Sequence, residues 1–184
     1  MKSLLCVCLI GVIAASAFAA DAPVNILKNP GAEEGQDAPA AWDRGNAVPG
    51  VEYLWDREAG FQGKAGLCLN KTAQRYFPIA EWRQQVEREG TLPALKVSAQ
   101  VKTENVTKAV LDVLFRDQND QWISHTWVAH IGAKEAGDPP VTHDWREYSG
   151  RVEIPANTKT ITIGLQIYGP GKVWFDDVLA VYAE

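Results

Sequence analysis

Cysteine, methionine and histidine are scarce in this sequence, whose 184 residues include three cysteines, one methionine and three histidines. Cys6 and Cys8 fall in an apolar N-terminal stretch, so Cys68 is the single cysteine of the remaining chain and has no partner for an internal disulfide. Its apolar neighbours predict a buried, unreactive thiol. The histidines form neither a His-x-His pair nor a cluster with cysteine, which argues against a zinc site.

Basic residues are outnumbered, because 18 lysines and arginines stand against 23 aspartates and glutamates, for a formal net charge of −5. Binding nucleic acid by neutralising phosphates needs the opposite balance, so this class of protein is disfavoured. The motifs of nucleophilic hydrolases, a Ser-His-Asp order or a G-x-S-x-G elbow, are also missing.

Paired carboxylates are present but badly placed for catalysis. Glycoside hydrolysis needs two carboxyl groups on either side of one sugar. The acidic pairs at 33–34 and 176–177 are sequence neighbours, whose side chains point to opposite faces of an extended chain. We therefore expect that this protein is not an enzyme.

A long apolar stretch occurs once, at the N-terminus. Lys2 precedes the apolar segment 4–20, and Ala17-Phe18-Ala19 fits the small-residue rule for cleavage, as is typical of a secretory signal peptide. Its alanine- and serine-rich end is weak for the alternative, a membrane anchor. We expect residues 1–19 to be removed, leaving a single domain, residues 20–184, that is secreted or periplasmic and has no membrane span.

Apolar and polar residues alternate through most of the remaining chain. This period of two places one face of a strand on a core and the other toward solvent or a ligand. It is clearest in the segments 95–102, 111–116, 147–154 and 161–168. Many short strands at such spacing predict an all-β protein, a sandwich or a barrel.

Three further segments need a separate interpretation. Residues 117–120 and 169–171 have the composition of hairpin turns. The segment 80–89 fits either a short helix or a strand, and we favour the strand. The segment 132–144 contains two adjacent prolines and several polar residues, which predicts a long loop.

Five short motifs, in order along the chain, resemble carbohydrate-binding modules of the family 4/9 type. They match the family's opening "L-x-N-x-G-F-E-x-G…P-x-x-W", its "G-x-x-[AS]-L" turn, its central "S-A-x-V-K" strand, its "W-x-x-Y-S-G" and its closing "[YF]-x-D-D-V", although Ala32 replaces the usual aromatic residue. The corresponding segments are 26–42, 63–67, 97–103, 145–150 and 172–178.

The resemblance implies a fold and a metal. The fold is an all-β jelly-roll β-sandwich of two antiparallel sheets, like the galactose-binding domain, with the first and last strands near each other. Family members often carry a structural Ca²⁺ there, for which carboxylate and carbonyl oxygens are suitable ligands. Carried over by position, the ligands are Glu33, Asp176, Asp177 and the backbone carbonyl of Lys64. The alternative is a capped turn and an aspartate paired with a cation such as Lys64.

Seven tryptophans suggest the ligand class. A pyranose ring stacks its C–H groups on an exposed aromatic ring, while polar side chains nearby bond its hydroxyls. Most tryptophans of a sandwich instead pack in the core or in hairpins, and the family resemblance assigns Trp42, Trp145 and Trp174 to such packing. His125 and His130 have opposite parity in one predicted strand, so we expect them to face apart. The residues predicted to form a binding groove are Trp82, Arg83, Gln100, Trp127, Gln166 and Tyr168.

The sequence thus predicts non-catalytic binding of a polysaccharide or other glycan. Such modules usually accompany an enzyme, which this chain does not contain. The alternative is an exported or envelope-associated sandwich that binds a protein partner through its aromatic residues.

Overall fold

The computed structural model describes residues 24–135 and 137–184, and the predicted signal peptide lies outside them. All regular elements in these ranges are β-strands. In chain order they are β1 (Asp43–Arg44), β2 (Val51–Asp56), β3 (Gly66–Lys71), β4 (Ala80–Glu87), β5 (Ala94–Val106), β6 (Lys108–Arg116), β7 (Trp122–Gly132), β8 (Val141–Glu153), β9 (Thr160–Ile167) and β10 (Gly171–Ala183).

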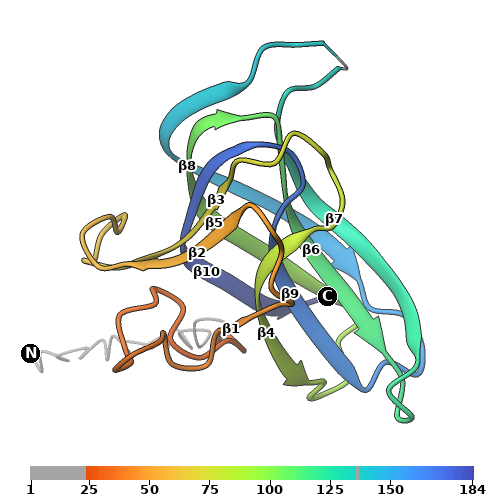
Figure 1. The fold of residues 1–184 in the computed structure, drawn as a ribbon. Coiled ribbons are helices and arrows are strands. Elements are labelled where there is room, and N and C mark those ends of the chain that lie inside the picture. Colours follow the sequence, from red (N-terminus) through yellow and green to blue (C-terminus); the bar gives the residue numbers. More distant parts are fainter. Residues whose placement is uncertain (1–23, 136) are drawn as a thin grey trace, which may run out of the picture.

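Two five-stranded antiparallel sheets pack face to face (Figure 1). One has the strand order β1-β4-β9-β6-β7, and we call it the front sheet. The other has the order β2-β3-β10-β5-β8, and we call it the back sheet. Apart from β6–β7 and β2–β3, which are consecutive, neighbouring strands in each sheet come from distant parts of the chain, as in a jelly roll. The predicted all-β sandwich of two antiparallel sheets is therefore confirmed.

The core lies between the sheets and consists of the apolar residues of each alternating strand. Ile161, Ile163 and Leu165 of β9 are fully buried, as are Leu111, Val113 and Phe115 of β6. Burial of one such side chain stabilises the fold by about 1.5–3 kcal/mol. From the back sheet, Val97, Val101, Val173 and Phe175 complete the same core.

The structure confirms some of the predictions for the strand, turn and loop segments and corrects others. Segment 80–89 forms a strand, β4, as favoured. Residues 117–120 turn the β6–β7 hairpin. Residues 169–171 do not turn a hairpin, because they lead from β9 in the front sheet to β10 in the back sheet. The predicted loop 132–144 is shorter than expected, since β8 begins at Val141 and pairs with the end of β5.

The first described residues lie along the last strand, as the resemblance implied. The backbone N–H of Ile26 donates to the carbonyl of Ala180 at 2.9 Å, and that of Val178 donates to the carbonyl of Pro30 at 3.0 Å. These bonds bring the segment of Glu33 beside that of Asp176. In residues 24–135 and 137–184, no helix has the length and apolar character to cross a membrane.

Candidate functional site on the outer face of the front sheet

The outer face of the front sheet presents polar residues in aligned rows. Across one row, Arg83 of β4 pairs with Gly164 of β9, Gly164 with Asp112 of β6, and Asp112 with Trp127 of β7. Antiparallel register places such partners on the same face, so their side chains are neighbours. A charged group, a gap, a carboxylate and an aromatic ring therefore follow one another across the sheet.

Gly164 lies in the floor of a hollow of about 220 Å³ on this face. A Cβ atom at Gly164 would lie 3.2 Å from Gln166 Nε2 and 3.3 Å from Glu81 Oε2, so a side chain there would crowd both groups. The hollow is lined by Glu81, Arg83, Gln85, Asp112, Leu114, Arg116, Asp120, Thr162, Gly164 and Gln166.

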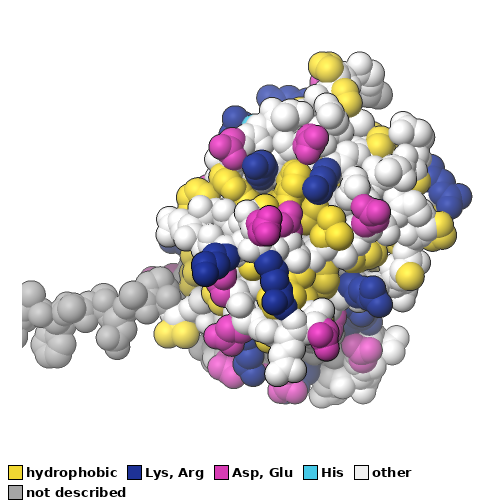
Figure 2. All heavy atoms as spheres, turned by 60° about the vertical axis from the view of Figure 1, so that its left-hand side comes forward, with side chains coloured by type: hydrophobic (Ala, Val, Ile, Leu, Met, Phe, Trp, Pro, Cys, Tyr) yellow, Lys and Arg dark blue, Asp and Glu magenta, His cyan; other side chains and the backbone are white. Residues whose placement is uncertain are grey.

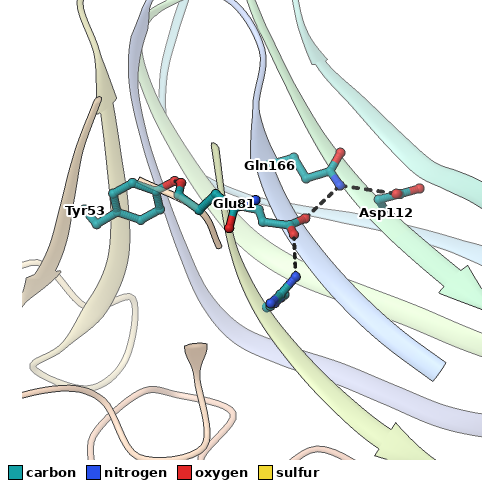
Figure 3. Close-up of polar contacts among 6 residues, drawn as sticks. Tyr53, Glu81, Asp112 and Gln166 are labelled. Atoms are coloured by element: carbon teal, nitrogen blue, oxygen red, sulfur yellow. Dashed lines mark hydrogen bonds and ion pairs between the residues drawn. The ribbon is translucent and has the colours of Figure 1, made fainter. Parts of the chain in front are cut away.

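Gln166 joins two carboxylates at this hollow (Figure 3). Its Nε2 donates to Glu81 Oε2 at 3.0 Å and to Asp112 Oδ2 at 3.3 Å. Its Oε1 is buried and has no hydrogen-bond partner among the described residues. A buried amide oxygen without a partner is unusual.

The electrostatics of the hollow follow from burial and from two hydrogen-bonding partners, His125 and Arg83. Burial raises the pKa of the Asp112 carboxyl, and the hydrogen bond from His125, whose Nδ1 lies 3.1 Å from Asp112 Oδ1, partly opposes this rise. Arg83 lies 3.5 Å from Glu81. Both carboxylates therefore have protein partners, and they present hydrogen-bond acceptors rather than unpaired charges.

A cluster of aromatic rings borders the hollow at one end. Trp127 is 42% exposed, and its ring packs edge-on against Tyr168 with centroids 5.8 Å apart. Tyr168 in turn packs against Phe77 at 6.1 Å. The Lys108 ammonium lies 4.1 Å from the Trp127 ring centroid and 4.6 Å from that of Tyr168. An exposed indole beside polar groups is the combination that a sugar ring requires.

An irregularity in β7 corrects the expectation that His125 and His130 face apart. The pairing with β6 shifts register between Leu111 and Asp112, where Val128 is an extra residue on β7. As a result His125, Trp127 and His130 are opposite Leu114, Asp112 and Val110, which share one face of β6. Thus the two histidines face the same way. The bulge reverses the parity that strict alternation predicts.

The structure brings together four of the six residues predicted to form the groove. Arg83 and Gln166 line the hollow, and Trp127 and Tyr168 form the aromatic cluster beside it. Gln166 and Tyr168 are 9% and 5% exposed, so they are more buried than an outward parity suggests.

The other two predicted groove residues lie elsewhere. Trp82 is 5% exposed in the core, where its Nε1 donates to the carbonyl of Cys68 at 3.1 Å. Because adjacent residues of a strand point to opposite faces, only one of Trp82 and Arg83 can face the core. The apolar indole of Trp82 does so, and Arg83 faces outward. Gln100 lies on β5 of the back sheet, paired with Asp176 and Glu147. Parity within one strand does not identify the sheet to which that strand belongs.

Sequence reasoning missed several residues of the site. Alternation in the segment 111–116 places Asp112 on the polar face of its strand, but it is 4% exposed and hydrogen-bonded. Glu81, His125 and Lys108 reach the site only through strand pairing. Gly164 had a detectable signal, because it is the one residue without a side chain on the outer face of the regular strand 161–167.

The predicted metal ligands approach one another at one end of the sandwich. A Cβ atom at Gly31 would lie 3.3 Å from Asp177 Oδ1, 3.6 Å from Asp176 Oδ1 and 3.8 Å from Glu33 Cγ. Even so, no group of three or more His, Cys, Asp or Glu side chains in the described residues has the arrangement of a metal site. Backbone carbonyls would therefore have to supply part of any coordination shell.

Backbone N–H groups, and not a cation such as Lys64, are the hydrogen-bond partners of Glu33 and Asp176 at this end of the sandwich. Glu33 Oε1 accepts from the backbone N–H of Lys64 at 2.7 Å and of Ala65 at 3.0 Å. Asp176 accepts from the N–H of Phe61 at 2.6 Å and of Asp177 at 2.7 Å. Within the described part of the chain, no lysine or arginine forms an ion pair with these carboxylates.

Burial raises the pKa of Asp176 to about 6, and the nearby charges of Asp177 and Glu33 add to the rise, while the two backbone hydrogen bonds oppose it. Oxygen ligands, excess negative charge and a destabilised buried carboxylate together fit a hard cation.

The outer face of the back sheet differs from that of the front sheet. On the side of the molecule that comes forward in Figure 2, basic and acidic side chains are interspersed, with hydrophobic ones between them. Trp174 of β10 lies on this outer face but is only 6% exposed. Its Nε1 donates to Asp56 Oδ2 at 3.0 Å, and the ammonium groups of Lys172 and Lys102 lie 4.4 and 5.6 Å from its ring centroid.

Comparison with known proteins gives one sequence relative and many structural ones. No family model matches the chain. A Bacillus subtilis protein described as the uncharacterized HTH-type transcriptional regulator YbfP is 28% identical over 135 residues. The match covers 67% of this chain but 41% of that protein, so the chain spans less than half the length of this curated relative.

The structural neighbours include carbohydrate-binding modules. The CBM22-1 xylan-binding domain of Xyn10C from Paenibacillus barcinonensis has a TM-score of 0.60 and 16% identity, covering 90% of this chain and 99% of that domain. TmCBM61, solved with β-1,4-galactotriose, has a TM-score of 0.52 and 15% identity, covering 87% and 99%.

An enzyme also has this fold. The Stig cyclase Fisc from Fischerella has a TM-score of 0.58 and 15% identity, covering 89% of this chain and all of that one. At such identities the likeness establishes the fold alone, which is the jelly roll of carbohydrate-binding modules. The finer assignment to family 4/9 stays a prediction.

Proposed function

We propose that this protein is an exported, non-catalytic glycan-binding module that holds its ligand on the outer face of the front sheet. The observation that carries the proposal is the juxtaposition of the exposed Trp127 with the polar hollow around Gly164. The aromatic ring offers a stacking surface, and the hollow admits a substituent of the stacked sugar. Export rests on the signal-peptide pattern of residues 1–19.

The polar groups of the hollow complement sugar hydroxyls. The carboxylates of Glu81 and Asp112 line the hollow and are hydrogen-bond acceptors. Arg83, whose side chain is about half exposed, supplies donors at the opposite side. Sugar hydroxyls both donate and accept, so a mixed set of this kind suits them better than a purely apolar pocket.

Two neighbours support a saccharide as ligand, because one is a xylan-binding domain and the other was solved with a galactotriose. These ligands belong to those proteins, and they provide the first saccharides to test here.

The two carboxylates of the hollow deserve comparison with a glycosidase pair. Glu81 and Asp112 face each other across Gln166, and the pKa of Asp112 is raised, as in a general acid. However, a single amide nitrogen bridges them, and Asp112 is 4% exposed. A scissile bond would need to reach the space that Gln166 fills. This arrangement supports binding without hydrolysis.

We also propose a structural Ca²⁺ held by Glu33, Asp176 and Asp177, with the backbone carbonyl of Lys64 as a further ligand. The unpaired acidic charge and the raised pKa of Asp176 support it. When bound, the ion would neutralise these carboxylates and link the first segment of the domain to β10.

Affinity electrophoresis and calorimetry test the binding proposal, with xylan, β-glucan, mannan and β-1,4-galactan as ligands. We expect binding to at least one polysaccharide, without release of reducing ends. Trp127→Ala should weaken it at least about tenfold, because the stacking surface is lost. Trp145→Ala on β8 of the back sheet is the control, and its affinity should match that of the wild type.

A folded wild-type protein that binds none of these polysaccharides would contradict the proposal. In that case the alternative, an exported sandwich that binds a protein partner through its aromatic residues, would become the better hypothesis.

A further inference from the structure

Lys108 is the cation of the site that lacks an acidic partner. It begins β6, and its ammonium lies over the rings of Trp127 and Tyr168 at 4.1 and 4.6 Å. No carboxylate in residues 24–135 and 137–184 lies within ion-pair distance of it. Arg83 and Arg116, the other cations of this face, lie 3.5 and 3.7 Å from Glu81 and Asp120.

The aromatic surroundings of the Lys108 ammonium attract its charge but do not accept hydrogen bonds from its N–H groups. Aromatic faces attract a cation but offer no lone pairs for its N–H groups. Burial between the rings lowers the pKa of Lys108, since the charged form loses hydration there. The adjacent His130 lies on the same face, where burial and the charge of Lys108 lower the pKa of its imidazole. An anion at this position would regain the lost interactions.

The remaining charges limit where an anion can bind. Arg83 and Arg116 line the Gly164 end of the hollow, but each already has a carboxylate partner, Glu81 or Asp120, so an anion would have to compete with that partner there. Lys108 lies at the opposite end of this face from Gly164, past the cross-strand pair of Gln166 and Val110, where its ammonium contacts Trp127 and Tyr168. A sugar that contacts Trp127 therefore has acceptors on one side and a free ammonium on the other.

We propose that the site selects glycans that carry an anionic substituent, a uronic acid carboxylate or a sulfate ester, and that this group binds Lys108. This inference rests on the proposed function, and it adds the charge of the substrate. An ammonium on a partly buried aromatic surface forms a charge-assisted hydrogen bond that is stronger than one between neutral groups.

Matched pairs of saccharides test the inference by calorimetry. One pair is an unsubstituted xylo-oligosaccharide and the same oligosaccharide with a glucuronic acid branch. The other is β-1,4-galactotriose and a sulfated galactotriose. We expect the wild-type protein to bind the acidic member of at least one pair about tenfold more tightly, with the preference falling as salt rises. The pair that shows the preference identifies the anion.

Three variants assign the preference to Lys108. Lys108→Met keeps an apolar chain on the rings and should reduce the affinity ratio to about one, whereas Lys108→Arg should retain it. Lys172→Met is the matched control, because Lys172 stacks on Trp174 in the same way at 4.4 Å but lies on the back sheet. Its ratio should equal that of the wild type.

The outcomes separate the two proposals. Equal affinity for the neutral and acidic members of both pairs, or a preference that survives in Lys108→Met, would overturn the anion inference and leave glycan binding intact. No binding to any of the four saccharides, nor to the polysaccharides above, would overturn both.

Discussion

The two outer faces of the sandwich carry the same pair of groups, a tryptophan under a lysine, with opposite results. On the front sheet Trp127 is 42% exposed beside a hollow, whereas on the back sheet Trp174 is 6% exposed beneath Lys172 and Lys102. Trp174 Nε1 also donates to Asp56, so its polar atom is satisfied within the protein.

The contrast shows that an outward tryptophan is available to a ligand only where its neighbours leave space. Gly164 provides that space on the front sheet. On the back sheet, larger neighbours close the surface, and Trp174 contributes to stability instead. Four predictions test this division of roles, from the largest expected effect to the smallest.

Filling the hollow should abolish binding while leaving the fold intact. Gly164→Val places side-chain atoms where Gln166 Nε2 and Glu81 Oε2 lie 3.2 and 3.3 Å from a Cβ position. Valine is well suited to a strand, so we expect a loss of affinity of at least about a hundredfold with a preserved circular dichroism spectrum. Ser98→Val on β5 of the back sheet, away from the hollow, is the control and should bind like the wild type. Undiminished binding by Gly164→Val would show that the ligand does not use the hollow.

Removing each tryptophan should separate binding from stability. Trp174→Ala opens a buried site and should lower the free energy of unfolding by about 3 kcal/mol. Trp127→Ala removes a ring that is 42% exposed. This variant should therefore lower the free energy of unfolding by about 1 kcal/mol, and it should also weaken binding. Urea denaturation measures both values. Equal losses of stability would contradict the distinction between the two faces.

Asp176 should make stability depend on pH when Ca²⁺ is removed. Its pKa rises from 3.8 to about 6 on folding, so its favourable contribution is complete below pH 3.8 and is lost as pH rises through about 6. We expect this group to favour the chelated protein at pH 5 over pH 7.5 by ~1.4 kcal/mol, because only part of its contribution is recovered at pH 5. Asp176→Asn should flatten that part of the profile.

Added Ca²⁺ should raise the melting temperature more at pH 7.5 than at pH 5, because protons compete for the same carboxylate. Elemental analysis of the purified protein is the independent measurement. An unchanged melting temperature together with no bound metal would remove the calcium proposal, and the wild-type pH profile would still test the burial of Asp176.

Cys68 gives the smallest expected effect and reports on the back sheet. It lies between its cross-strand partners Leu54 and Trp174, and it is fully buried although it points to the outer side. Burial raises the pKa of its thiol to about 12, so a thiol reagent at pH 8 should react only after unfolding. In Trp174→Ala the reaction should become measurable in the native state. Rapid labelling of the wild type would show that this face is open.

Alternation made much of the fold predictable. The segment 161–167 reads as a strand with one apolar face, and it is the central β9. The ordered motifs near 26–42 and 172–178 placed the first described segment beside β10, where hydrogen bonds join Ile26 to Ala180. The strands are local features, since each depends on side chains one or two residues apart, whereas the place of the first segment beside β10 was implied by the family resemblance.

The site was harder to predict, because it combines strands from distant parts of the chain. Arg83, Asp112 and Gln166 belong to β4, β6 and β9, which are neighbours only through sheet order. The bulge at Val128 turned His130 to the same face as His125, contrary to strict alternation. A single extra residue reverses every later parity in a strand.

The sequence by itself determined that this chain forms short strands with one apolar face, because the period of apolar residues is encoded residue by residue. Only the tertiary structure decided which sheet receives each strand and which tryptophan stays open. It buried Trp82 and Trp174 and left Trp122 and Trp127 exposed. It also placed Lys108 beside Trp127, where no carboxylate of the described residues lies within ion-pair distance. The reason is that exposure and pairing depend on neighbours across the sheet, which the order of residues along one strand does not specify.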